Sequence, residues 1–216
     1  MKKETSVKHM VLLAMLCAVS FLAVCLIRIP VVLFLNYEPK DVIITIGSFL
    51  LGPLAGFIVS LVVSLLEMFT ISTTGPIGAI MNLLSSCAFA CTAGFIYRKK
   101  RTLGGAVLGL VCGAVLMIAA MLLWNYLITP LYMTGTSRLD VAAMLIPVFL
   151  PFNALKAGLN TAFTLALYKP LVSALRKAKL VPPQANPTEN KAGTYILAGI
   201  LLITCILLLL VYRGIL

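Results

Sequence analysis

An asparagine and a lysine stand three residues apart in a strongly apolar stretch, FLPFNALKAGLN, which covers residues 149–160. At this spacing Asn153 and Lys156 fall on one face of a helix, and Asn160 continues the same stripe. A lysine at the centre of a membrane helix costs about 2.5–3.5 kcal/mol. We therefore expect a compensating partner or a ligand beside Lys156, because ionisable groups inside membranes are usually functional.

Two interpretations of Lys156 follow from these residues. In the first, the lysine stem lies in lipid and the amine reaches water by snorkelling. In the second, the helix restarts after Pro151, which places Asn153 and Lys156 in its first two turns at the mouth of a cavity. An unbroken helix would leave the amine about 22 Å from either end, at 1.5 Å per residue. We favour the second interpretation, in which Lys156 contacts a ligand.

Two further amides stand on other apolar segments, Asn82 and Asn125. Each can hydrogen-bond neighbouring helices together. An amide also donates and accepts hydrogen bonds, which suits a neutral, planar ligand with a polar edge. Four neighbours could supply an apolar slot for such a ligand, namely Met68, Trp124, Tyr132 and Phe152.

The composition is that of an all-α, polytopic membrane protein. Hydrophobic residues make up 62% of the 216 residues and charged residues 11%, whereas soluble domains carry about a quarter charged residues. The net charge of +11 does not indicate nucleic acid, because most of the 17 lysines and arginines gather in the N-terminal tail, in RKKR at 98–101 and in 169–191. These are short segments between apolar runs, so the pattern predicts a cytoplasmic N-terminus under the positive-inside rule.

Apolar segments lie at about 11–29, 42–70, 79–97, 103–128, 141–175 and 195–211. Gly52 and Pro53 divide the second segment into two helices joined by a tight turn, the first of them short. Pro147 and Pro151 kink or interrupt the segment at 141–175. We expect a membrane domain over 1–179, a linker over 180–193 and an additional transmembrane helix over 194–216.

The polar loops at 34–41, 71–78 and 129–140 then share the outer face, which makes it the expected binding face. The sequence also lacks the motifs of several common chemistries. The sequence has no Walker G-x-x-x-x-G-K-[ST] for ATP phosphates and no H-E-x-x-H for zinc, and its one histidine, His9, is in the tail. No histidine or carboxylate joins the membrane cysteines, so neither a metal site nor a nucleophilic enzyme is expected.

The ordered motifs NYEPKD, GPLAG, STTGPIG, WNYLITPLY and LPFNALK, with A-x-x-x-A at Ala14 and Ala18, resemble the riboflavin-specific S components of energy-coupling factor (ECF) vitamin transporters. The resemblance covers about residues 8–179. It implies a six-helix bundle in the bacterial cell membrane, to which 194–216 adds a further helix. It also implies a riboflavin pocket near the outer face, with riboflavin as transported ligand rather than cofactor. Energy would come from a separate coupling module, a transmembrane coupling protein with two cytoplasmic ATPases.

The resemblance also implies roles for individual residues. Asn125, Asn153 and Lys156 match polar contacts to the flavin, and Ala14 and Ala18 match the surface that docks on the coupling protein. The loop from Tyr37 to Asp41 matches a lid over the pocket. The other candidate pocket residues that the motifs contribute are Glu38, Pro39, Thr74, Gly75 and Asn82.

Two alternatives remain open at this point. The chain could be an S component for another vitamin or for FMN, in which case Lys156 could meet a phosphate. It could also be a secondary transporter that works alone. Such carriers show paired acidic residues at the midplane and an internal repeat, whereas Glu67 is the one acidic candidate here and no repeat is evident.

Overall fold

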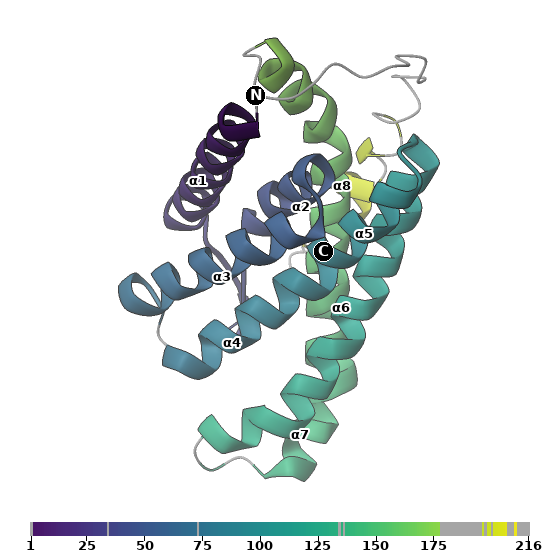
Figure 1. Cartoon of the computed structure of the whole chain (residues 1–216). Coiled ribbons are helices and arrows are strands. Elements are labelled where there is room, and N and C mark those ends of the chain that lie inside the picture. Colours follow the sequence, from purple (N-terminus) through teal and green to yellow (C-terminus); the bar gives the residue numbers. More distant parts are fainter. Residues whose placement is uncertain are drawn as a thin grey trace.

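The computed structural model describes residues 2–33, 35–72, 74–133, 135, 137–177, 196, 198–199, 201–206 and 210, without the side chains of 2–6, 132, 172, 175 and 176. Nearly all of this part of the chain is helical, arranged as a bundle in which α6 and α8 run side by side (Figure 1). The elements are α1 (Lys2–Leu26), β1 (Ile29–Val32), β2 (Leu35–Tyr37), α2 (Lys40–Leu51), α3 (Pro53–Thr70), α4 (Gly75–Ser86), η1 (Cys87–Cys91), α5 (Thr92–Lys99), α6 (Leu103–Tyr132), α7 (Arg138–Met144), η2 (Leu145–Phe149) and α8 (Leu150–Lys177).

Within the described residues, five helical stretches are long and apolar enough to cross a membrane. They are Val7–Leu26, Pro53–Thr70, Gly75–Lys99, Leu103–Leu131 and Arg138–Leu171. The remaining helix, α2, has 12 residues, about 18 Å at 1.5 Å per residue, and falls short of the ~30 Å hydrocarbon core. The chain is therefore a multi-pass membrane protein with one short, largely buried helix inside the bundle.

The turn between α2 and α3 forms where the sequence predicts it. Gly52 has φ of +100° and links the two helices, and Pro53 follows at the first position of α3. Glycine accepts this positive φ without a Cβ clash, and proline fits the first helical turn because no N–H is needed there. The turn keeps α2 short, so its N-terminal residues lie deep in the protein.

Several helices extend beyond the apolar segments expected from the sequence. The first helix begins at Lys2, α4 begins at Gly75, and α6 continues to Tyr132. The segment with Pro147 and Pro151 is not broken, because a π-helical stretch, η2, carries it from α7 into α8. In a π turn the backbone hydrogen bonds span five residues instead of four, so a carbonyl group can lack its usual N–H partner. A proline, which has no N–H to donate, can then be accommodated without ending the helix.

The loop expected at 34–41 is mostly ordered structure. β1 and β2 form an antiparallel hairpin in which Ile29 pairs with Tyr37 and Pro30 with Asn36. The hairpin is the one departure from an all-helical fold among the described residues. Lys40 and Asp41, expected in the same loop, instead begin α2 and are buried.

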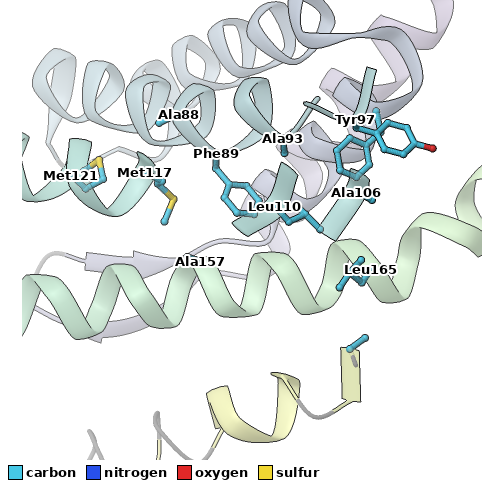
Figure 2. Packing of buried hydrophobic residues seen from close by; sticks show 12 residues of the cluster. Ala88, Phe89, Ala93, Tyr97, Ala106, Leu110, Met117, Met121, Ala157 and Leu165 are labelled. Atoms are coloured by element: carbon cyan, nitrogen blue, oxygen red, sulfur yellow. The ribbon is translucent and has the colours of Figure 1, made fainter. Parts of the chain in front are cut away.

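The main apolar core lies between α5, η1, α6 and α8. Phe89, Leu110 and Met117 are fully buried there, and Figure 2 shows all three directed toward α8. Ala198 from the C-terminal region belongs to the same cluster. The linker at 180–193 lies outside the described residues, and within 194–216 the residues 201–206 are helical, so a complete additional transmembrane helix stays a prediction.

Candidate functional site

A polar cavity lies between the hairpin, α3, α4, α6 and α8. Its empty space totals about 620 Å³, open solvent at the mouth included. Its lining residues are Arg28, Leu35, Asn36, Glu38, Glu67, Ile71, Ser72, Thr74, Met81, Asn82, Ser85, Met121, Phe152, Asn153 and Lys156. The wall combines a few apolar side chains with charged and amide groups, as expected for a site that binds a polar small molecule.

Lys156 is balanced by a carboxylate on α2. The side chain is 6% exposed, and its Nζ lies 3.1 Å from Asp41 Oδ2 and 3.4 Å from Ser85 Oγ. An ammonium group has three donors, and its contacts with the described residues use two of them, which leaves one for a ligand. The partner expected from the cost of a membrane lysine is therefore present within the chain.

Asp41 is itself held from two sides. Ser86 donates a hydrogen bond to Oδ1 and Asn160 donates to Oδ2 at 3.2 Å. A buried ion pair is stable only when further hydrogen bonds satisfy the charged groups. Asn160, the third member of the polar stripe on α8, thus supports the carboxylate that Lys156 contacts and does not itself line the cavity.

A second set of charges lies around Lys40. Its Nζ contacts Glu67 at 2.6 and 2.5 Å and Glu38 at 2.8 Å. Arg28 Nε lies 3.2 Å from Oε1 of Glu38, the carboxylate oxygen that does not contact Lys40. The Asn82 amide donates a hydrogen bond of 2.8 Å to Glu67 Oε2. The carboxylates of Glu38 and Glu67 reach the cavity wall, whereas Lys40 stays behind it.

The comparisons with known proteins agree with this architecture. The sequence model of the family described as "ECF transporter, substrate-specific component" matches residues 8–168. The chain belongs to this family. It is accordingly a subunit of a transporter and not an enzyme.

Relatives of this S component carry transporter names. It is 29% identical over 178 residues to the riboflavin transporter RibU of Staphylococcus aureus (strain TCH60), covering 79% of this chain and 93% of that protein. It is 25% identical over 188 residues to the riboflavin transporter FmnP of Bacillus subtilis (strain 168), covering 81% and 98%.

A solved structure has the same fold. It is described as "Structure and mechanism of the S component of a bacterial ECF transporter" and matches with a TM-score of 0.65 and 28% identity. The match covers 82% of this chain and 99% of the other.

The structure brings some of the expected site residues of this S component together. Glu38, Thr74, Asn82, Phe152, Asn153 and Lys156 all line the cavity. Asn153 reaches it from the first turn of α8, and its amide nitrogen donates 2.8 Å to the Phe149 carbonyl. That contact fixes the orientation of the amide at the cavity wall.

Other expected residues lie off the wall. Asn125 is fully buried within α6, where it donates to the Met121 carbonyl at 2.7 Å and accepts from Thr129 at 3.0 Å. Trp124 packs against the main apolar core, and Tyr37 is buried at the end of the hairpin. Met68, Pro39 and Gly75 also do not line the cavity. The side chain of Tyr132 lies outside the described residues. Ligand contacts of these residues stay predictions.

Sequence reasoning missed several wall residues: Arg28, Leu35, Asn36, Ile71, Ser72, Met81, Ser85 and Met121. Ser85 could have been found, because it stands three residues after Asn82 and so shares its helix face. Glu67 had been considered only as an acidic group of an ion-coupled carrier. Arg28 gives no local signal, because its partners are Glu38 after the hairpin and the Ile71 carbonyl after α3.

Proposed function

We propose that this chain captures riboflavin in the cavity and presents it to a separate ATP-driven coupling module for uptake. The names of its relatives support the ligand, and the cavity wall formed by Phe152, Asn153 and Lys156 is the observation that carries the proposal. This S component contains no nucleotide-binding motif, so energy must come from partner proteins.

The cavity suits the two chemically different parts of riboflavin. The isoalloxazine ring is flat and largely apolar, with carbonyl oxygens and a ring N–H along one edge. Lys156 can donate to a ring oxygen, and the Asn153 amide can pair with a carbonyl beside an N–H. Phe152, Met81 and Met121 offer apolar surface for the ring.

The ribityl chain carries hydroxyl groups that both donate and accept. The remaining wall is rich in matching groups: Arg28, Asn36, Glu38, Glu67, Ser72, Thr74 and Asn82. Carboxylates and hydroxyls accept from such a chain, and arginine and amide groups donate to it. We therefore place the ring edge near Lys156 and the ribityl chain near Glu38 and Glu67.

The coupling module is proposed to dock on α1. Ala14 and Ala18 are both exposed on that helix, and small side chains allow another helix to approach closely. Membrane lipid covers the other exposed apolar faces. Nothing in the charge distribution calls for a nucleic-acid partner.

The orientation follows from the basic segments. The chain is proposed to lie in the bacterial cell membrane with its N-terminus and RKKR (98–101) in the cytoplasm. The Gly52 turn belongs to the same end, because Arg98 lies beside it. The cavity then opens toward the outside, where the vitamin is captured.

The direct test is binding by the purified protein. Riboflavin should give flavin absorbance bands in the protein and saturable quenching of its own fluorescence. In liposomes that also hold the coupling module, uptake should require ATP. Uptake driven by an ion gradient without that module would instead establish a secondary transporter, and saturable binding of another vitamin with none of riboflavin would reject the ligand.

Lys156→Met removes the ligand contact but leaves Asp41 buried beside Ser86 and Asn160. Lys156→Met combined with Asp41→Asn removes both charges and is the better variant, because an unpaired buried charge costs about 3–5 kcal/mol in stability. We expect this pair to fold and to bind riboflavin about 10- to 100-fold more weakly, at about 1.4 kcal/mol per tenfold.

Unchanged riboflavin affinity in the folded double variant would show that Lys156 serves Asp41 alone. The affinity of the same variant for FMN is a second test. A much larger loss for FMN than for riboflavin would mean that the amine contacts the phosphate, which reverses the proposed direction of the ligand.

A further inference from the structure

Lys40 is among the most buried side chains of the described chain, at 1% exposed, although it is a lysine. It stands at the first position of α2, where the positive end of the helix dipole disfavours a cation. Neither helix propensity nor solvation accounts for a lysine there. Its position must be stabilised by the groups that it contacts.

Those groups are two carboxylates from different parts of the chain. Glu38 lies between β2 and α2, and Glu67 lies near the end of α3. Both are about as buried as Lys40, both touch its Nζ, and both line the cavity. Without the Lys40 ammonium between them, the buried carboxylates of Glu38 and Glu67 would face each other. Like charges at short range repel strongly in a low-dielectric interior.

The contacts extend from this centre to both strands of the hairpin. Arg28 precedes β1, pairs with Glu38 and donates to the Ile71 carbonyl at 2.9 Å. Glu67 accepts from Asn82 on α4. Both strands of the hairpin are thus attached, at its open end beside the Ile29–Tyr37 pair, to the α3–α4 side of the cavity by one connected set of charges.

We propose that Lys40 is the positioning residue of the ligand site: it fixes Glu38 and Glu67 on the cavity wall and holds the hairpin against α3 and α4, and so sets how fast the ligand leaves. It does not line the cavity, so it acts through the two carboxylates. The identity of the ligand rests on the proposed function, but the arrangement of the hairpin does not.

The two buried lysines then have different signatures. Lys156 lines the cavity, so its loss removes a ligand contact and leaves the hairpin in place. Loss of Lys40 leaves every direct contact group present but releases Glu38 from Glu67. The hairpin should therefore become more dynamic even in protein without ligand.

The first experiment measures hydrogen–deuterium exchange of the β1–β2 amides in the full, ligand-free protein. Lys40→Met should raise exchange in the hairpin by about tenfold or more, because a buried network that loses one member loses its coupling. Lys177→Met is the matched control, since Lys177 is exposed at the far end of α8, and it should leave hairpin exchange unchanged.

Lys40→Met combined with Glu67→Gln tests the mechanism and protects against misfolding of the single variant. The amide of the glutamine still accepts from Asn82, and Glu38 keeps Arg28, so the charges balance again. Hairpin exchange should fall below that of the single variant, because the repulsion between Glu38 and Glu67 is removed, but should stay above that of the unmodified protein, because no group bridges the two positions. A double variant whose hairpin exchange equals that of the unmodified protein would overturn the proposal.

The second experiment follows riboflavin dissociation by stopped-flow fluorescence. Lys40→Met should raise the dissociation rate about tenfold or more with little change in the association rate. A folded Lys40→Met protein with unchanged hairpin exchange and unchanged dissociation would overturn the proposal. If the unmodified protein does not bind riboflavin at all, the proposed function fails, while the exchange measurement still decides the role of Lys40.

Discussion

Two helices of this protein carry the same small-residue pattern in opposite environments. Ala14 and Ala18 on α1 point away from the protein and are exposed. Gly109 and Gly113 on α6 face inward, where a Cβ would stand 2.7 Å from the Ala93 carbonyl oxygen and 2.5 Å from that of Phe89. Small residues four apart therefore predict a close helix contact, but the contact can be internal or can await a partner.

The difference follows from what surrounds each stripe. On α1 the inward face is supplied by other residues, Leu12, Leu16 and Val24, which are buried, so the alanines are left over on the outside. On α6 the glycines let the backbones of η1 and α5 approach closely, and the core of Figure 2 fills the space beside them. Substitutions in the two stripes should therefore fail in different ways.

The largest effect is expected in the buried stripe. Gly113→Leu would push a side chain into the Phe89 backbone, which cannot move aside as a flexible side chain can, so little or no folded protein should be recovered. The measurement is the monodisperse fraction and thermal midpoint in detergent. Gly104→Ala is the control, because the nearest atom to a Cβ there is 4.0 Å away, and its midpoint should change little. Normal yield and midpoint for Gly113→Leu would mean that α6 does not pack on η1 as described.

Substitutions in the exposed stripe should impair transport but not riboflavin binding. Ala14→Trp or Ala18→Trp would hold a partner helix away from α1, so uptake in liposomes with the coupling module should be abolished. Riboflavin affinity of the isolated subunit should stay within about twofold, since no cavity residue is touched. Val19→Trp is the control: Val19 is a large hydrophobic residue that is already exposed on α1, so this substitution should leave uptake unchanged. Loss of binding together with uptake would place the alanines in an internal contact.

The smallest effect is expected at a third contact of a small residue. A Cβ on Gly158 would stand 2.5 Å from Cys205 Sγ, so the C-terminal region packs on α8 at this glycine. Lys156, two residues earlier, faces the cavity instead. A chain ending at Leu180 should then keep its riboflavin affinity, with at most a lower thermal midpoint. A well-folded truncation that loses binding would assign the region after 180 to the ligand site.

The sequence was a good guide where the signal is local. Gly52–Pro53 specifies a turn through backbone φ and a missing N–H, and that turn is present. The apolar segments predict the spanning helices because burial in lipid acts on composition over about 20 residues. The π-helical passage at Pro147 and Pro151 was less predictable, because a proline permits a break, a kink or a wide turn, and the packing of α7 and α8 selects among them.

The site was predictable only in part for the same reason. Asn153 and Lys156 are recognisable in the sequence as polar residues on an apolar helix, and both line the cavity. Asn125 looks the same in the sequence, yet its amide is occupied by Met121 and Thr129 of its own helix. An isolated polar residue carries no information about whether its partner is a backbone group one turn away or a ligand.

By itself the sequence determined a multi-pass helical membrane protein, the family to which it belongs and a polar stripe on α8, since these depend on composition, period and motif. Only the tertiary structure decided which charge meets which. Asp41 stands in a segment that reads as a polar loop, yet it lies in the first turn of α2 and pairs with Lys156 on α8. Lys40, its neighbour, joins Glu38 and Glu67 instead. Electrostatic partners are chosen by distance in space, and in a low-dielectric interior that choice sets both the cost of each charge and the shape of the site.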